Sequence, residues 1–212
     1  MFSKYTPLIA VIVVASVMGY ITENIWIAIR FGYLDNRGML MPGLIGYGIA
    51  MVGIYFILGT PQQPRLMGQE VELHEIVTKV IYYIVMSAII VSVGEILLGN
   101  LVEHMCKFEW WNYASLPLHI GKYTSVFTSI GFGSLITLFM NSIFPKIGEL
   151  AIELCVKGST KVILLICLLL VVDFFYEIQY MVKNKKIHKV WKINLRGRWI
   201  DRQGHITYGL RG

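Results

Sequence analysis

The sequence predicts an all-α, polytopic membrane protein with five transmembrane helices and a short basic C-terminal tail. Of its 212 residues, 56% are hydrophobic and only 15% are charged, and the mean hydropathy is +0.62. Ordinary soluble domains are much less apolar. Several apolar runs reach about 20 residues, the length that a helix needs to cross a hydrocarbon core roughly 30 Å thick. The runs do not alternate between apolar and polar residues, which argues against a transmembrane β-barrel.

Each expected helix is delimited by its flanking residues. The run after Lys4 is treated as a spanning helix, because no small-x-small cleavage site closes it as in a signal peptide. The linker "GTPQQPRLMGQEVELHE" separates the second and third helices, and Lys79 and Lys107 should lie at opposite interfaces of the third. The expected spans are 8–29, 40–59, 80–104, 122–144 and 160–182. They form a transmembrane domain at 1–184, followed by a basic tail at 185–212.

Positive charge is concentrated in the tail. Nine of the 19 Lys and Arg residues lie between Lys183 and Arg211, where Asp201 is the only acid. Basic segments beside spanning helices stay in the cytoplasm and attract anionic headgroups. We therefore expect a cytoplasmic C-terminus, an external N-terminus, membrane lipids as partners and no nucleic acid. Two short runs flanking Gly204 predict a small β-hairpin, with Trp191 and Trp199 near the headgroups.

Acidic residues interrupt the apolar runs at different depths. The segment "VGEILLGNLVEHM" carries Glu95 and Glu103. At the helical rise, Glu95 would lie roughly 24 Å from Lys79 and about 18 Å from Lys107, deep in the hydrocarbon zone, whereas Glu103 would be only about 6 Å from Lys107. A charged carboxylate at the centre costs about 2.5–3.5 kcal/mol unless it is protonated or paired. The spacing of 95, 99 and 103 places both acids and Gly99 along one stripe that should face protein.

The other membrane acids repeat this arrangement toward the tail side. If the first, third and fifth helices run in the same direction, a polar cavity should open to the cytoplasm. It would be floored by Glu23, Glu95, Glu103 and Asp173 and covered by the loops that hold Arg37 and Trp111. Two blander interpretations stay open, namely that Glu103, His104 and Glu177 simply meet water at the interface, and that Glu23 pairs with Arg30 or Arg37 for structural reasons.

Three segments resemble one membrane-protein family. "MGYITENIW" at 18–26, "NRGMLMPGLIGYG" at 36–48 and "GEILLGNLVEHMCKFEWWNYASLPLHIGKYTSVFTSIGFG" at 94–133 are similar to the bacterial family labelled putative ABC-transporter type IV, or CmpB-like permease. The resemblance covers about residues 15–140. Pro42 and Gly43 are transposed relative to the family pattern, Gly46 replaces its second proline, and Asn112 replaces its aspartate. The matching positions are Glu23, Asn36, Arg37, Gly38, Tyr47, Gly48, Glu95, Gly99, Glu103, Trp111, Tyr113 and Gly121.

This resemblance implies transport in a bacterial cytoplasmic (cell) membrane. The sequence lacks a GxxxxGK[ST] phosphate-binding loop, so the chain is expected to have no ATPase of its own and to depend on a separate ATP-binding subunit. Because five helices make a small bundle, a homo-oligomer is the other expected partner, needed to enclose a path. The candidate substrate or ion pathway residues are Glu23, Asn36, Arg37, Glu95, Glu103, Trp111, Tyr113 and Asp173. No cofactor and no metal are expected, since "HEIVT" lacks the second histidine of an HExxH site.

Two other functional classes stay open from the sequence. An intramembrane enzyme acting on a lipid-linked substrate could draw acid–base groups from Glu95, Glu103, His104 or His119, although no GxSxG motif is present. A structural or assembly protein would use the buried charges only for pairing. The three cysteines, Cys106, Cys155 and Cys167, show no CxxC spacing and are expected to be packing residues.

Overall fold

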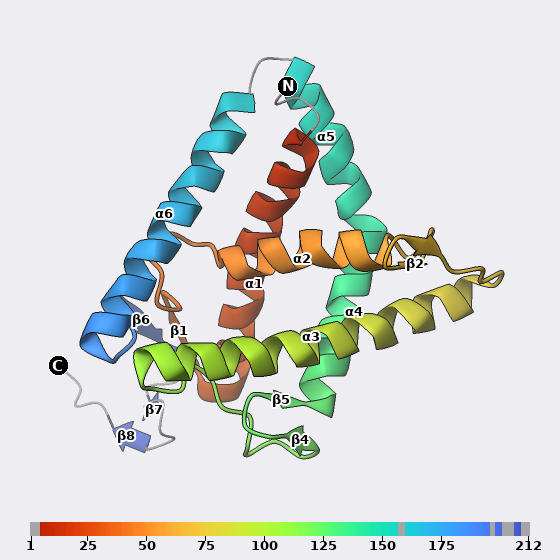
Figure 1. The fold of residues 1–212 in the computed structure, drawn as a ribbon. Coiled ribbons are helices and arrows are strands. Elements are labelled where there is room, and N and C mark those ends of the chain that lie inside the picture. Colours follow the sequence, from red (N-terminus) through yellow and green to blue (C-terminus); the bar gives the residue numbers. More distant parts are fainter. Residues whose placement is uncertain (1–4, 157–159, 196–197, 201–205, 209–212) are drawn as a thin grey trace.

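A computed structural model describes residues 5–156, 160–195, 198–200 and 206–208. Within these residues the chain is mostly helical, as the sequence predicts, and the helices are joined by short antiparallel strand pairs (Figure 1). The helices are α1 (Thr6–Phe31), α2 (Ile45–Leu58), α3 (Ile76–Cys106), α4 (Val126–Ser142), α5 (Phe144–Val156) and α6 (Thr160–Asn184).

Fewer helices can cross a membrane than the five expected. In the described part of the chain, α1, α3 and α6 are long and apolar enough, with 26, 31 and 25 residues. The pair α4 and α5, bent by 41°, counts as a fourth crossing if it is one broken span. Helix α2 has only 14 residues, about 21 Å of helix, which is shorter than the hydrocarbon core. In the described residues, three helices are thus candidate membrane spans by length and composition, or four if the bent pair is one span.

Two expected boundaries were wrong for local reasons. The second span was expected at 40–59, but α2 begins only at Ile45, because Pro42 cannot donate a backbone hydrogen bond and the chain up to Leu44 is irregular. Residues 145–159 were expected to be a loop, but α5 occupies this segment as far as Val156. Pro145 interrupts the backbone hydrogen bonding at the bend and suits the first turn of a new helix. Ile147 and Ala151, four residues apart, then give α5 a buried face.

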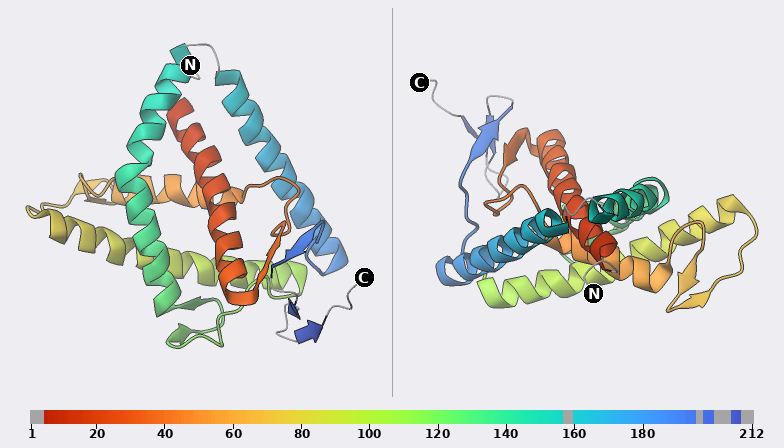
Figure 2. Two further views of the ribbon diagram at one scale, coloured as in Figure 1. Left: turned by 180° about the vertical axis from the view of Figure 1, so that it is seen from behind. Right: turned by 90° about the horizontal axis from the view of Figure 1, so that it is seen from above.

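The cavity predicted from the sequence required α3 to run alongside the first and last helices. The structure shows a different arrangement. In Figures 1 and 2, α3 and α2 lie crosswise to α1, α6 and the α4–α5 pair. Close backbone contact fixes this crossing at α4, where a Cβ on Gly133 would lie 2.5 Å from the Ile84 carbonyl oxygen. Likewise, a Cβ on Gly48 of α2 would lie 2.3 Å from the Ile12 carbonyl oxygen of α1. Small residues at both crossings let the backbones approach closely.

The core lies where these helices cross. Its buried members come from five helices: Ala10, Val11, Ala15, Ile54, Leu58, Tyr83, Ile136, Phe139, Met140, Ile147 and Ala151. A smaller cluster of Val102, Cys106 and Met181 joins the C-terminal end of α3 to α6. Cys106 and Cys167 are free thiols, and the side chain of Cys155 lies outside the described residues.

Four short strand pairs connect and extend the helices. Strand β1 (Tyr33–Asp35) pairs with β6 (Lys192–Asn194), which ties the tail to the segment that follows α1. The other pairs are β2 (Arg65–Leu66) with β3 (Gln69–Glu70), β4 (His119–Ile120) with β5 (Thr124–Ser125), and β7 (Arg198–Ile200) with β8 (Ile206–Tyr208). The β7–β8 pair confirms the expected tail hairpin, although Gly204 lies outside the described residues.

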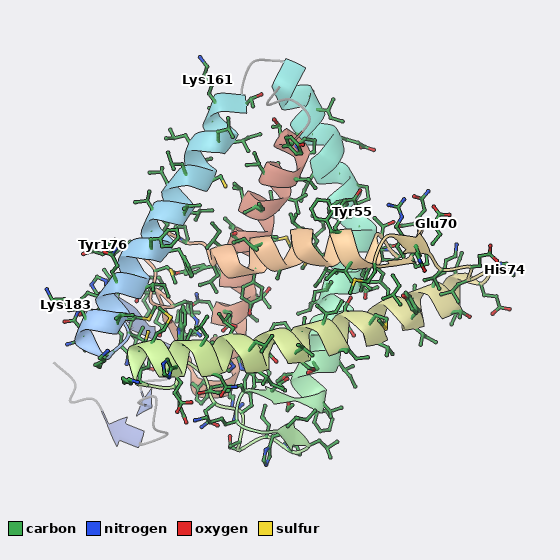
Figure 3. The ribbon with its side chains drawn as sticks, viewed as in Figure 1. Tyr55, Glu70, His74, Lys161, Tyr176 and Lys183 are labelled. Atoms are coloured by element: carbon green, nitrogen blue, oxygen red, sulfur yellow. The ribbon has the colours of Figure 1, made fainter. Side chains whose placement is uncertain are left out.

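Labelled side chains mark the two ends of α6 and the position of the β2–β3 hairpin. In Figure 3, Lys161 and Lys183 lie at opposite ends of α6, while Glu70 and His74 lie beside the β2–β3 hairpin at the far end of α3. The direction of α6 from Lys161 to Lys183 brings the chain to the same end of the molecule as β1. The tail and the first interhelical segment are therefore neighbours.

Candidate functional site

The centre of the candidate site is an ion pair between Glu23 of α1 and Arg37. Arg37 Nη2 lies 3.0 Å from Glu23 Oε2, and Arg37 Nη1 lies 3.5 Å from Asp35 Oδ1. Tyr47 of α2 donates its hydroxyl to the other oxygen of Glu23 at 2.5 Å. Arg37 is only 8% exposed and Asp35 only 1% exposed. The structural pairing of Glu23 with Arg37 considered from the sequence is thus observed, with Asp35 as an additional partner.

The backbone after α1 positions this ion pair. Asn24 on α1 accepts a hydrogen bond from the Asp35 backbone N–H through Oδ1 at 3.0 Å, and Asp35 Oδ1 accepts one from the Arg37 N–H at 2.9 Å. Arg37 itself has a φ of 53°, a left-handed conformation that is uncommon for a residue with a side chain. Burial alone would lower the pKa of Arg37, but the charges of Glu23 and Asp35 outweigh it and hold this pKa above its usual value.

Glu95 of α3 and Tyr113 of the following loop are half-buried and adjoin this centre. Glu95 Oε2 is a buried oxygen without a hydrogen-bond partner in the described residues, and Arg37 Nε is likewise a buried nitrogen without one. The pKa of Tyr113 is raised well above its usual value, first by burial and then by the negative charges of Glu23 and Glu95. Tyr113 is therefore close to both acids. The segment 107–123 folds back to bring it there, with the Tyr113 N–H donating to the Lys122 carbonyl at 2.7 Å.

Glu103 belongs to a separate, half-exposed cluster. Its carboxylate accepts a hydrogen bond from Lys122 at 2.7 Å and one from the Tyr123 hydroxyl at 2.6 Å, and Lys122 also binds Glu109 at 2.9 Å. The side chains of Glu103 and Lys122 are each 36% exposed. Hydrogen bonds from Lys122 and Asn112 lower the pKa of Glu109, and those to Glu103 and Glu109 raise the pKa of Lys122. Glu103 is thus partly exposed at the protein surface and fully hydrogen-bonded to the 107–123 loop.

Tyr123 is what α3 meets across Gly99. A Cβ on Gly99 would lie 2.4 Å from Cγ of the Tyr123 ring, so only glycine leaves room for the ring there. Trp111 donates its indole N–H to the Tyr123 carbonyl at 3.0 Å and packs edge-on against the ring. Burial, followed by the hydrogen bond to Glu103, raises the pKa of Tyr123 to about 12. Trp111 therefore holds the 107–123 loop in place and does not itself reach Glu95 in any contact that the structure records.

Asp173 and Asn36 hold backbone segments instead of meeting Glu95. Asp173 of α6 accepts hydrogen bonds from the Leu40 and Met41 N–H groups at 3.1 and 2.9 Å. Asn36 donates to the His188 and Met39 carbonyls, each at 2.9 Å. From the sequence, Asp173 was expected beside Glu23 and Glu95 in one polar cavity. In the structure its hydrogen-bond partners are instead backbone groups of the irregular chain before α2.

Some contacts were not anticipated from the sequence. His188 Nδ1 lies 2.8 Å from an oxygen of Glu177, which is fully buried. The pairing of Lys122 with Glu103 was not predicted either, and no periodicity relates His188 to Glu177. Asp35 gave one signal, since it precedes "NRG" directly and could have been recognised as a local partner of Arg37. Among the described residues there is no group of three or more His, Cys, Asp or Glu side chains that could hold a metal ion.

Comparison with known proteins identifies the chain by family alone. No curated protein and no solved structure matches it. A family model described as "Putative ABC-transporter type IV" matches residues 10–178, which contain most of α1, all of α2 to α5, most of α6 and all eight candidate residues. The apolar helices agree with this assignment to a membrane protein. The chain belongs to this ABC-transporter-related family.

Proposed function

We propose that this chain is a permease-like component of a transporter, with no ATPase of its own, whose pathway passes the partly buried charged centre of Glu23, Arg37, Glu95 and Tyr113. Its energy would come from a separate ATP-binding subunit, because the sequence has no phosphate-binding loop of the GxxxxGK[ST] type. The membrane in question would be a bacterial cytoplasmic membrane, with the basic tail inside.

One observation carries this proposal. Arg37 Nε and Glu95 Oε2 are buried polar atoms without partners in the described residues, and they belong to a centre placed among apolar helices. Buried polar groups are almost always satisfied in native proteins. Acidic and basic groups inside membrane segments usually mark pathways for ions, protons or substrates. A solute or water that passes the centre would supply the missing hydrogen bonds.

The other candidate residues support a narrower pathway than the one expected from the sequence. Asp173 and Asn36 have backbone partners, and Glu103 has Lys122 and Tyr123. These three are fully engaged in holding the fold. Because their hydrogen bonds are satisfied within the protein, a structural role is favoured for these three residues. The transport proposal therefore depends on the centre around Glu95.

The test compares solutes in cells that lack the protein with cells that regain it. A deletion strain would express the wild type, Glu95→Gln, the double variant Glu23→Gln with Glu95→Gln, or the control Glu75→Gln at equal membrane levels. Glu75 is exposed at the start of α3. Mass spectrometry should find a solute whose cellular level is restored by the wild type and by the control but not by the other two.

Purified protein then separates transport from chemistry. In liposomes with its ATP-binding subunit, the wild type should redistribute that solute unchanged. Wild-type solute levels in cells carrying the double variant, with normal amounts of folded protein, would refute the pathway. A lipid altered chemically in the liposomes would point to an enzyme instead.

A further inference from the structure

The tail carries an exposed apolar face at the point where it pairs with the chain leaving α1. Trp191, Ile193 and Leu195 occupy alternate positions in β6 and directly beside its two ends, and they are 40%, 54% and 53% exposed. Alternate residues of a strand point to the same side, so these three form one face. The residues between them turn inward, since the Lys192 Nζ lies 3.8 Å from the centre of the Tyr33 ring.

Strand pairing makes this face part of a ribbon and holds it firmly. Ile193 is paired with Leu34 of β1, and the Leu195 N–H donates to the Gly32 carbonyl at 2.8 Å. Asn36, 1% exposed, accepts a hydrogen bond from the Val190 N–H at 3.2 Å while it donates to His188. A Cβ on Gly38 would lie 2.9 Å from the Ile187 side chain. The apolar face is therefore presented by a fixed two-stranded ribbon.

The ribbon lies where two candidate spans end. Strand β1 begins two residues after α1 ends at Phe31, and the tail leaves α6 at Asn184. Both α1 and α6 are long and apolar enough to cross a membrane. Segments that immediately follow such helices lie at the level of the lipid headgroups. An apolar face at this level, with a tryptophan at one end, suits the boundary between headgroups and acyl chains.

Charge around the ribbon identifies the kind of surface that it meets. Residues 183–195 contain five lysines and no acid. Of these, Lys183, Lys185, Lys186 and Lys189 are exposed. Lys185 donates to the Met105 carbonyl at 3.4 Å, whereas within the described part of the chain the other three have no ion-pair or hydrogen-bond partner. Lysines beside an apolar interfacial face bind anionic lipid headgroups electrostatically.

We propose that the β1–β6 ribbon is a membrane-interface anchor, which inserts Trp191, Ile193 and Leu195 below the headgroups while Lys183, Lys186 and Lys189 bind anionic lipid. The anchor is independent of whether the charged centre conducts a solute. It rests on the ribbon's own geometry and on its position at the ends of α1 and α6.

A spin label tests the insertion. Ile193→Cys would be labelled in a background in which Cys106, Cys155 and Cys167 are replaced by serine, and the protein would be placed in lipid nanodiscs with or without about 30% phosphatidylglycerol. In the anionic discs the label should be accessible to oxygen and shielded from a water-soluble nickel reagent. A label at Met67, an 81% exposed residue of the β2–β3 turn, should not respond to lipid charge.

Lysine variants test the electrostatic part. Neutralising one lysine should lower the preference for the anionic lipid roughly fivefold at most, and the triple change Lys183→Gln, Lys186→Gln and Lys189→Gln should abolish the dependence of the label on lipid charge. The control, Lys146→Gln with Lys161→Gln, should retain it. Nickel access to position 193 in anionic discs would overturn the proposal. So would shielding that persists in detergent and rises with protein concentration, which would assign this face to a second copy of the chain.

Discussion

At the scale of single residues, Arg37 is the position on which most buried charge depends. It binds Glu23 and Asp35 together, and its own side chain is almost fully enclosed. Removing one partner of a buried pair is more damaging than the pair is stabilising, because an uncompensated charge is left behind. If Arg37 were removed, Glu23 and Asp35 would be left without their cationic partner.

We therefore expect Arg37→Met to lower the free energy of unfolding by about 3–5 kcal/mol. Unfolding of the purified protein in mixed micelles would measure this loss. Adding Glu23→Gln to the Arg37→Met variant should recover part of it, because one of the abandoned charges disappears. Full additivity of the two changes would show that the pair is not coupled and would contradict this account.

At the scale of elements, the packing of α3 on the 107–123 loop depends on Gly99. Replacement by alanine should displace the Tyr123 ring, which lies 2.4 Å from the added Cβ, and should break the hydrogen bond from Tyr123 to Glu103. We expect a loss of about 1–3 kcal/mol, the range for overpacking. The matched control is Gly94→Ala on the same helix, where nothing lies within 4 Å of the added Cβ.

That control should be neutral or stabilising, since alanine favours a helix by up to about 1 kcal/mol over glycine. Thermal unfolding of both variants under the same conditions measures the difference. Equal stability of the two variants would mean that the Tyr123 ring does not occupy the groove at Gly99.

The ionic cluster of the 107–123 loop gives a pH dependence. The pKa of Glu109 is lowered by its hydrogen bonds from Lys122 and Asn112. A carboxyl whose pKa is lower in the folded state stabilises the fold above its unfolded pKa, near 4.3, and this contribution is lost as the pH falls through the lower folded value. The melting temperature of the wild type should therefore fall more steeply than that of Glu109→Gln as the pH drops below about 4.5.

The exposure of this cluster limits the size of the effect. High salt should shrink the difference between wild type and Glu109→Gln, because exposed charges are screened. Parallel melting curves for the two proteins across this pH range would contradict the assignment of Glu109 to the cluster.

The attachment of the tail to β1 depends on Asn36. We expect Asn36→Ala to raise the hydrogen-exchange rate of the Val190 amide, because this N–H loses its acceptor on the Asn36 side chain. Mass-spectrometric exchange over residues 186–195 would measure the change. Asn184→Ala serves as the control, since Asn184 only donates back to Tyr180 within α6, and it should leave Val190 protected.

At the scale of the whole molecule, the ends of α6 decide its orientation. Lys161 and Lys183 lie at opposite ends of this 25-residue helix (Figure 3). In a background without the native cysteines, Lys161→Cys should react with an impermeant maleimide on intact cells, whereas Lys183→Cys should react only after the membrane is opened, as the basic tail predicts. Labelling of both positions from the same side would show that α6 does not cross.

The crossing of the helices also explains why part of the fold could be predicted and part could not. Hydrophobic length identified α1, α3 and α6, because a helix in lipid must satisfy its own backbone and present apolar side chains. It misjudged α2, since a short apolar helix inside a protein and a spanning helix share the same composition. It missed α5, because the segment after Pro145 is too polar and too short to be recognised as a span. The crosswise direction of α3 depends on close contacts at Gly133 and Gly99 with residues distant in sequence, which hydropathy does not encode.

The sequence by itself determined that this is an apolar helical protein with a basic tail, and that Glu23, Arg37 and Glu95 are unusual among its residues. Composition and spacing suffice for this, because the cost of a charge in hydrocarbon depends on local depth. Only the tertiary structure decided the partners. Arg37 takes Glu23 and Asp35, Asp173 takes the chain before α2, and Glu95 retains an unpaired oxygen. Pairing depends on angles between helices and on the path of irregular segments, which packing across the whole chain determines.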